Sequence, residues 1–530
     1  MTENAGRLRS GQTKWRRICC YLRPACEQGI QWCKLERISM PKKQGMSRRK
    51  FLSVAASVAG YSALGARASE GQQQNLPNVV LILADDMGWT GPACYGSDLH
   101  ETPNIDRLAT EGMRFTNAYT ASPVCTPTRA SIMTGKHPAR LNMTTWSERA
   151  IQRRTDKGDR ALAPPITESD LALEYVTMAE ILQKEGYRTL HVGKWHLGGA
   201  THYPETQGFE VNIGGTFWGA PRTYWYPYSG LGRSSAGILE HRYVPHLEFG
   251  EKGEYLTDRL TSEAIAAVEC VRDEPFFLHM AYHTPHVPIE GKPDRVAHYK
   301  AKVREGMNHT NARYAAMVDS LDENVGRILA KLDEWDIADR TVVIFYSDNG
   351  GFTKIREGEQ VTSNLPLRSG KGSLYEGGIR VPLIVRWPHV ALPGGVCAEP
   401  VTSTDLLPTL LAGLELEPEY AEKEALDGKS FLGQLKTPGK PLDRDTLYWH
   451  YPHYYFNISP VTSPVTALRH KQWKYIEYYE DNRRELYNLA DDLGETRDLS
   501  DKHPYHVERF HEMLVDWRER VNARLPEPNV

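Results

Sequence analysis

The sequence predicts an α/β protein with a large, mostly parallel sheet sandwiched between helices, followed by a small C-terminal antiparallel sheet with one helix. Two observations support this fold class. Up to about residue 413, continuous apolar runs of strand length alternate with amphipathic helical patterns, which is typical of a parallel sheet covered on both faces. From about residue 414, the alternation gives way to short β-rich segments and one final helical pattern.

Four apolar runs predict the buried strands of the large sheet. The first reads Asn-Val-Val-Leu-Ile-Leu over residues 78–83, and the others follow at 188–192, 275–281 and 341–346. Helices are expected between them at 177–184, 261–271 and 311–335. The last of these has the clearest apolar stripe. The stripe comprises Tyr314, Met317, Val318, Leu321, Val325, Ile328, Leu329 and Leu332.

Composition divides the chain into three parts. Residues 76–413 carry the alternating pattern and are expected to form the large domain. Residues 414–530 are expected to form a small α+β subdomain, entered through a stretch rich in Glu, Pro, Gly and Lys at 415–440. Within it, strands are predicted at 446–451, 465–469, 473–479 and 485–488, and a helix at 504–521.

The remaining part, residues 1–68, is basic, with 14 Lys and Arg against 3 Asp and Glu in a chain of net charge −3. The rest of the chain is therefore acidic, which argues against nucleic acid as a partner. The run 47–52, Ser-Arg-Arg-Lys-Phe-Leu, is similar to a twin-arginine export signal, and an apolar stretch and Ala66-Arg67-Ala68 follow it. We expect export by the twin-arginine translocase to the periplasm or beyond, with no stable membrane span because the apolar stretch is short. The alternative is a basic tail beside a short hydrophobic helix.

Polar residues follow each of the four predicted strands. In open α/β sheets, ligands bind beyond the carboxyl ends of the strands. Taken singly, each cluster has a structural interpretation, such as a helix cap, a turn or a buried histidine. Four clusters at one edge favour a site. They are Asp85-Asp86, Gly193-Lys194-Trp195-His196-Leu197-Gly198, His283-Thr284-Pro285-His286 and Ser347-Asp348-Asn349-Gly350.

The acidic and amide side chains of this edge suit a hard divalent cation. Carboxylate and amide oxygens, without thiolate or imidazole, indicate Ca²⁺ or Mg²⁺ rather than zinc. The remaining side chains are basic, and together with a cation they describe a pocket for a tetrahedral oxyanion. The expected metal ligands are Asp85, Asp86, Asp348 and Asn349, and the basic residues are Arg129, Lys194, His196, His286 and Lys371.

Cys125 opens the run Cys125-Thr126-Pro127-Thr128-Arg129, which closes with Met133-Thr134-Gly135. Pro127 suits a first helical position, so the thiol is expected near a helix N-terminus, where negative charge is favoured. A thiol in this setting could be a nucleophile, a metal ligand or a packing residue. The run resembles the signature of the type I sulfatases, whose cysteine is oxidised after translation to formylglycine (3-oxoalanine), an aldehyde.

The resemblance extends over most of residues 76–415 and includes Asp85-Asp86-Met87-Gly88, the run 102–108, Gly193-Lys194-Trp195-His196, Ser347-Asp348-Asn349-Gly350 and the Lys371 loop. It implies the alkaline phosphatase superfamily and enzymes similar to exported bacterial arylsulfatases and N-acetylgalactosamine sulfatases. It further implies that the four oxygen ligands bind calcium, with magnesium the alternative. A formylglycine-generating or equivalent maturation enzyme would oxidise Cys125.

The resemblance also implies roles for the basic residues. Arg129 would orient the formylglycine, Lys194 would contact it and the sulfate, and His196 would hold its hydroxyl. His286 and Lys371 would bind sulfate and assist the leaving oxygen. His283 is expected near the same edge and is the alternative to His286 for this role. In the mechanism so implied, one hydroxyl of the hydrated aldehyde, activated by the metal and Asp348, attacks sulfur. The second, deprotonated with help from His196, expels sulfate.

An insertion at about residues 199–256 predicts the substrate class. It is rich in aromatic and arginine side chains, which stack on sugars and pair with sulfates or carboxylates. The alternative is that the aromatics pack the insertion onto the domain. A second candidate rim is 146–154, with Trp146, Arg149, Arg153 and Arg154. The insertion carries Phe217, Trp218, Arg222, Tyr224, Trp225, Tyr226, Tyr228, Arg233, Arg242 and Tyr243.

We therefore expect a sulfuric ester hydrolase acting on sulfated carbohydrate, such as sulfated polysaccharide or glycosaminoglycan fragments. One alternative is a phosphate or phosphonate ester hydrolase of the same superfamily, which would share the fold and the metal edge. Another is a glycan-binding protein without catalysis, which would show damage to the site; every position named above holds a chemically competent residue.

Overall fold

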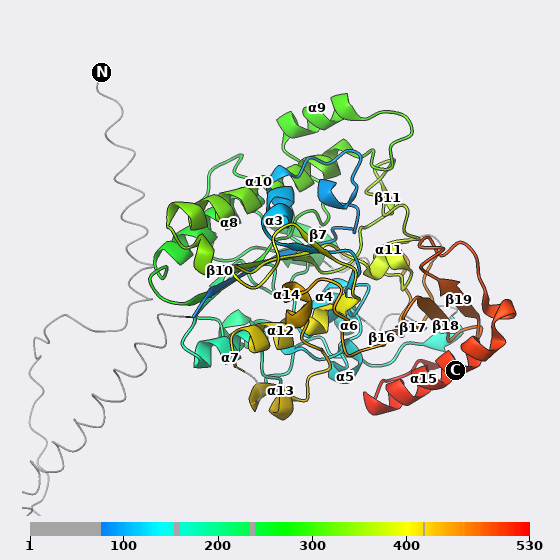
Figure 1. Cartoon of the computed structure of the whole chain (residues 1–530). Helices are drawn as coiled ribbons and strands as arrows, with labels where there is room; N and C mark the ends of the chain where they lie inside the picture. The colour runs from blue at the N-terminus through cyan, green and yellow to red at the C-terminus, as the bar shows by residue number, and fades with distance from the viewer. Residues whose placement is uncertain are drawn as a thin grey trace, which may run out of the picture. The chain divides into compact units, whose positions relative to one another are not determined.

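The computed structural model describes residues 76–152, 160–233, 239–247, 249–416, 419–458 and 461–529. Pro77–Ile265 and Phe276–Val530 form one compact unit, whose elements appear in Figure 1. The expected export signal, the extension before it, Arg153 and Arg154 lie outside the described residues. Among the described residues, no helix combines the length and apolar character needed to cross a membrane.

An eight-stranded sheet forms the centre of this unit, in the order β14-β2-β13-β10-β1-β9-β5-β6. Neighbouring strands from β10 to β6 run parallel, and all four predicted strands are among them. The prediction of a mostly parallel sheet is confirmed. The sheet strands are β1 (Asn78–Ala84), β2 (Met113–Phe115), β5 (Arg188–Gly193), β6 (Val211–Ile213), β9 (Phe276–Ala281), β10 (Thr341–Ser347), β13 (Leu383–Arg386) and β14 (Gly395–Cys397).

The register brings the carboxyl ends of the central strands to one edge. Ala84 of β1 lies opposite Ser347 of β10, and Gly193 of β5 lies opposite Ala281 of β9. Every residue of β1, β9 and β10 is buried, which explains why these strands read as continuous apolar runs. The polar clusters that follow the strands therefore begin side by side.

Helices cover both faces of the sheet, as Figure 1 shows. One layer contains α3 (Pro103–Glu111), α8 (Leu256–Glu269) and α10 (Ala312–Glu334), and the other contains α4 (Cys125–Thr134), α7 (Met178–Lys184) and α12 (Leu406–Gly413). The α10 stripe is buried at all eight predicted positions. Asn311 caps α10 by accepting hydrogen bonds from the N–H groups of Arg313 and Tyr314.

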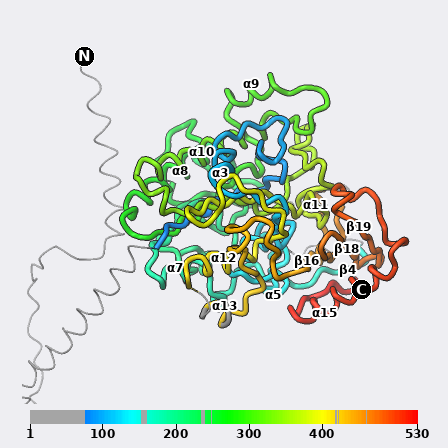
Figure 2. The backbone as a smooth tube through the Cα atoms, in the orientation of Figure 1, coloured from blue at the N-terminus to red at the C-terminus, as the bar shows by residue number. Residues whose placement is uncertain are grey.

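The C-terminal part is a four-stranded antiparallel sheet with one helix, as predicted, and it is drawn in brown to red in Figure 2. One of its faces packs on the helix through Leu468, Tyr475, Phe510 and Leu514. The other face joins a hydrophobic cluster with residues of the large part. The boundary proposed at residues 413 and 414 coincides with the end of α12 and stays a prediction. The elements are β16 (Thr446–Tyr451), β17 (Val465–His470), β18 (Trp473–Tyr478), β19 (Arg484–Asn488) and α15 (Pro504–Arg520).

A buried charge cluster connects this small sheet to the segment after the Lys371 loop. Lys474 of β18 contacts Glu376 of α11 (Glu376–Ile379) at 2.8 Å and Glu495 at 3.2 Å. The Tyr119 hydroxyl donates to the second oxygen of Glu376 at 2.7 Å. All the charged side chains are fully buried, so each depends on its partners for compensation.

Candidate active site

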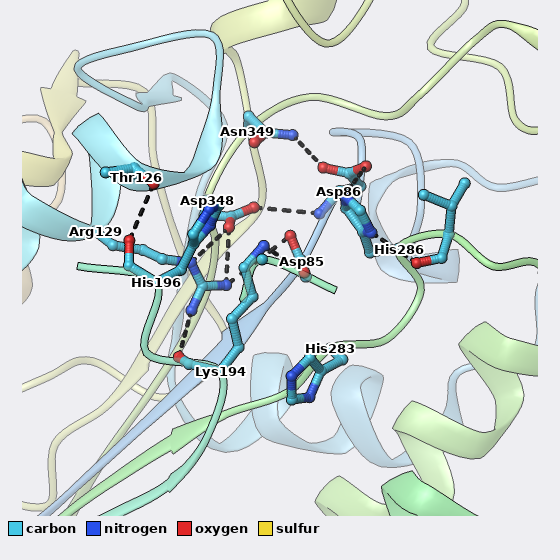
Figure 3. Close-up of polar contacts among 12 residues, drawn as sticks. Asp85, Asp86, Thr126, Arg129, Lys194, His196, His283, His286, Asp348 and Asn349 are labelled. Carbon is cyan, nitrogen blue, oxygen red and sulfur yellow. Dashed lines mark hydrogen bonds and ion pairs between the residues drawn. The ribbon is translucent and has the colours of Figure 1, made fainter. Parts of the chain in front are cut away.

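Two pairs of acidic and amide side chains meet where β1 and β10 end. Asp85 and Asp86 directly follow β1, and Asp348 and Asn349 directly follow β10. The Asp86 N–H donates to Asp348 Oδ1 (3.2 Å), and Asn349 Nδ2 donates to Asp86 Oδ1 (2.7 Å). All four residues are buried, and Figure 3 shows them converging. The structure thus brings together the four expected metal ligands from positions more than 260 residues apart.

Each carboxylate of this cluster has a cationic partner. Arg129 extends from α4 and also donates from Nη1 to the Lys194 carbonyl at 2.8 Å, which links α4 to the segment after β5. The lysines come from two other segments, one following β5 and one in the glycine-rich loop before α11. The closest pairs are Arg129–Asp348 (2.8 Å), Lys194–Asp85 (2.7 Å) and Lys371–Asp86 (2.6 Å).

The surroundings act differently on two of the carboxylates. Burial alone would raise the pKa of Asp348, but the charges of Arg129 and Lys194 outweigh it and hold that pKa below its usual range. For Asp85, burial dominates. The pKa of Asp85 lies well above its usual value, because Lys194 offsets only part of the burial and Asp348 adds repulsion. Crowded, buried carboxylates of this kind are stabilised by a further positive charge.

The donor set fits a hard divalent cation. Asp85 Oδ1 and Asn349 Oδ1 are buried and accept no hydrogen bond from the described part of the chain. One ligand atom each from Asp85, Asp86 and His286 lie within 4.8 Å of one another. Most of these donors are carboxylate and amide oxygens, which calcium and magnesium prefer. His286 adds one nitrogen to a group that the sequence predicted to contain only oxygens.

Cys125 is the first residue of α4, so its thiol lies at a helix N-terminus. The helix begins two residues earlier than Pro127 suggested, and this proline occupies the third position, where an N–H also has no partner within the helix. Burial alone would raise the pKa of Cys125. The charges of Lys194, His196 and Lys371 and a hydrogen bond with His196 outweigh burial and lower that pKa to about 6. A pKa lowered in this way favours the thiolate, which is the reactive form of cysteine.

Two hydrogen bonds hold this turn against its neighbours. Thr126 Oγ1 donates to the His196 carbonyl at 3.0 Å, as Figure 3 shows. The Gly372 N–H donates to the Pro123 carbonyl at 2.9 Å, which fixes the Lys371 loop beside the start of α4. The thiol, His196 and the Lys371 loop are thereby brought to one place from three separate segments.

Glu148 is a site residue that the sequence did not identify. It lies in α6 (Ser147–Gln152) and is buried, with Oε2 2.6 Å from His196 Nε2 and Oε1 accepting from the Gly219 N–H at 2.9 Å. Burial alone would lower the pKa of His196, but Glu148 and Cys125 outweigh it and raise that pKa. A single carboxylate inside a stretch noted for Trp146 and its arginines carries no motif, so the sequence offered no signal for it.

Gly219 brings the insertion against His196. A Cβ atom at this position would lie 2.3 Å from His196 Cε1, so only glycine permits the contact. Tyr224, expected on a sugar-binding rim, is instead fully buried, and its hydroxyl donates to the carbonyls of His283 (2.6 Å) and His286 (2.9 Å). Its role is packing and positioning, which was the alternative considered for the aromatics of this insertion.

The structure distinguishes the two histidines after β9. His286 Nε2 lies 3.6 Å from Asp86 Oδ2, and the Val287 carbonyl accepts from His286 Nδ1 at 2.8 Å. Burial and the charge of Lys371 lower the pKa of His286 to about 3, although Asp86 opposes them. Burial also lowers the pKa of His283 well below its usual value. His286 is thus the histidine beside the carboxylates, and both are neutral here.

Comparison with known proteins gives a consistent family. A family model described as Sulfatase matches residues 77–415, and one described as N-sulphoglucosamine sulphohydrolase, C-terminal, matches 370–520. A Formosa agariphila protein named Sulfatase is 34% identical over 81% of this chain and 85% of its own length. Human N-acetylgalactosamine-6-sulfatase is 34% identical over 70% of this chain and 68% of its own. The crystal structure of Ps i-CgsB in complex with k-i-k-neocarrahexaose superimposes with a TM-score of 0.65 at 29% identity, covering 83% of this chain and 92% of that one.

Proposed function

This chain belongs to the sulfatase family of the alkaline phosphatase superfamily, and we propose that this enzyme hydrolyses sulfate esters of a sulfated carbohydrate with a calcium ion and a formylglycine derived from Cys125. One observation carries the proposal. A thiol with a lowered pKa begins α4 among basic side chains, and two of these, Lys194 and Lys371, also pair with carboxylates of a cluster whose free oxygens fit a hard cation. Attack on a sulfate ester places negative charge on the sulfate oxygens, and positive charges around the nucleophile stabilise that charge in the transition state.

The metal and the modified residue have separate tasks in the proposal. Calcium would be held by the oxygens of the two acidic pairs and, when bound, would polarise the sulfate oxygens. Formylglycine, when formed, would supply two hydroxyls on one carbon, one to attack sulfur and one to allow release of sulfate. The residues that would hold calcium are Asp85, Asp86, Asp348 and Asn349.

Arg129 and the two lysines position charge for the reaction. Arg129 donates to Asp348 and to the Lys194 carbonyl, so it fixes a cation ligand and Lys194 at the same time. In the unmodified chain the pKa of Lys371 lies well above its usual value, because Asp86 and then Cys125 outweigh the effect of burial, and Asp86, the larger of the two, is unchanged by maturation. Lys371 therefore keeps its proton and can donate it toward the leaving oxygen.

His286 acts as a neutral group in this proposal. Its Nδ1 proton is donated to the Val287 carbonyl, which leaves Nε2 as an acceptor facing Asp86. With its pKa lowered to about 3 by burial and by Lys371, His286 has no proton to give at neutral pH. We assign the proton donation to Lys371 and substrate orientation to His286.

His196 is the proton acceptor for the step that releases sulfate. It contacts Cys125 and carries Glu148 on its other side, 2.6 Å from Nε2. Glu148 stabilises the positive charge that develops when His196 takes up a proton, and it fixes the orientation of the ring. Glu148 is a positioning residue because it acts through His196.

A carbohydrate substrate is supported by the relatives. The human relative is an N-acetylgalactosamine-6-sulfatase, and the related crystal structure holds an oligosaccharide, k-i-k-neocarrahexaose. We further propose that a formylglycine-generating or equivalent enzyme matures Cys125, and that the twin-arginine translocase exports the chain to the periplasm or beyond. These two partners rest on the sequence.

The proposal is tested by comparing nitrophenyl sulfate with nitrophenyl phosphate as substrates of the purified enzyme. We expect kcat/KM to be higher for the sulfate ester, because the matching family model and the relatives named above are sulfatases. A panel of defined sulfated mono- and oligosaccharides then identifies the sugar. A large preference for the phosphate ester, or desulfation of no saccharide on the panel, would contradict the proposal.

A further inference from the structure

A second pocket, rich in arginine, lies beside the active site. Its volume is about 380 Å³, within the range of about 300–1,000 Å³ that is usual for small-molecule sites. Its side chains come from the insertion, from the segment after β9, from α10 and from the β11–β12 hairpin (Ile355–Arg356 and Glu359–Gln360). Two glutamates, Glu240 and Glu357, are also present. We call it the arginine pocket, after Arg222, Arg233, Arg242, Arg313 and Arg356.

Two lining residues connect this pocket directly to the catalytic histidines. Ala220 lines the pocket and follows Gly219, the residue that contacts His196 and donates to Glu148. Val287 also lines the pocket and follows His286. The pocket is therefore adjacent to the active site on two separate segments.

The pocket has an excess of positive charge. Glu240 accepts from Arg242 at 3.0 Å, and Glu357 is paired with Arg313, so both acidic groups are already compensated by arginines of the lining. Arg222 adds a guanidinium whose Nε donates to the Leu231 carbonyl at 2.9 Å. This bond orients the rest of the planar group. An arginine held in this way is suited to bind sulfate or carboxylate with two parallel hydrogen bonds.

Arg356 adds positive charge from a different segment than Arg222. It lies in the β11–β12 hairpin, where its guanidinium is 5.6 Å from the centre of the Phe352 ring. Outside its first 68 residues the chain is acidic, so five arginines from three segments around one cavity are not explained by average composition. An anionic ligand accounts for the arrangement.

We propose that the arginine pocket binds a second anionic substituent, a sulfate ester or a carboxylate, of the same saccharide chain whose sulfate ester is hydrolysed in the active site. This inference rests on the proposed function. It deepens that function by making the preferred substrate a polyanionic oligosaccharide, recognised at two charged positions. A monosulfated sugar fills only the catalytic site and gains nothing from the pocket.

The test compares saccharides that differ only in the second substituent. Disaccharides of one backbone are prepared with one sulfate, with two sulfates, and with one sulfate and one carboxylate. We measure kcat/KM for each, with nitrophenyl sulfate as the single-anion reference. Wild type is expected to favour the dianionic compounds over the monosulfated one by about tenfold or more, since each charged hydrogen-bonded pair contributes on that scale. The two dianionic arms distinguish sulfate from carboxylate.

The double variant Arg222→Gln/Arg356→Gln is expected to reduce this preference about tenfold, measured as the ratio of kcat/KM for a dianionic disaccharide to that for nitrophenyl sulfate. Arg497→Gln, an exposed arginine of the C-terminal part, is the matched control and should leave the ratio unchanged. Turnover of nitrophenyl sulfate also reports that each variant is folded. An undiminished ratio in the double variant, or equal kcat/KM values for monosulfated and dianionic disaccharides in wild type, would overturn the role proposed for the arginine pocket but not the proposed function. No turnover of any sulfate ester by wild type would overturn the proposed function and this inference with it.

Discussion

Replacing Glu148 by glutamine tests whether its carboxylate controls the proton affinity of His196. Glu148→Gln keeps the size of the side chain and an oxygen for the Gly219 N–H, but it removes the negative charge 2.6 Å from His196 Nε2. A buried hydrogen bond to a charged partner contributes about 1.5–3 kcal/mol. Since one pKa unit corresponds to about 1.36 kcal/mol, the raised pKa of His196 should fall by about one to two units.

The assay is the dependence of kcat on pH with nitrophenyl sulfate. In our proposal His196 accepts a proton, so its neutral form is active and the acid limb of the profile follows its pKa. In Glu148→Gln that limb should move to lower pH by about one to two units, and kcat on the plateau should fall about tenfold or more because a weaker base accepts the proton less readily. Glu148→Asp retains the charge and should keep the acid limb closer to wild type.

Thermal unfolding of both variants provides the folding control. A residue that only supports the fold would lower kcat and the midpoint of unfolding without moving the acid limb. If folded Glu148→Gln and wild type have coincident acid limbs, the carboxylate does not tune His196, and our account of this pair is wrong.

Three further predictions follow from the same contacts. Cys125→Ser should retain the fold but lose multiple turnover, and mass spectrometry of the active wild-type enzyme should find an aldehyde group (CHO) in place of the CH2SH side chain at this position; full turnover by the variant would exclude the aldehyde. A calcium chelator should abolish activity and lower the thermal midpoint, and added calcium should restore both. The fall in the midpoint should be smaller in acid, because the raised pKa of Asp85 lets it hold a proton there. The repulsion that this proton relieves returns as pH rises. Lys474→Met should lower the free energy of unfolding in urea by about 3–5 kcal/mol, because it leaves buried Glu376 and Glu495 without their shared lysine partner. The same change at exposed Lys471 should have little effect, and equal values for the two variants would contradict this prediction.

The large sheet could be predicted where its strands are long and fully buried. Residues 78–83 and 341–346 are apolar throughout because helices cover both faces, and such runs stand out in a sequence. The side of the sheet beyond β10 escaped prediction. Its strands β2, β13 and β14 contain only three or four residues each, too few for a periodicity to emerge.

The site residues that directly follow those strands could be predicted from the strand pattern, and the others could not. Asp86 and Asp348 lie together because parallel strands bring their carboxyl ends to one edge, so the topology alone predicts the encounter. Glu148 and Gly219 reach His196 from an isolated short helix and from an insertion, and no rule of local spacing relates these three positions.

The amino-acid pattern by itself determined the α/β class, the edge where the chemistry gathers and the residue types available to it, because these depend on burial periodicity and on where each strand ends. Only the tertiary structure decided the partners of each side chain. It paired His196 with Glu148, selected His286 over His283 and gathered five arginines from three segments around one cavity. The physical reason is that pKa values and ligand contacts depend on distances of a few ångströms between segments far apart in the chain, and those distances are set by the packing of the whole core.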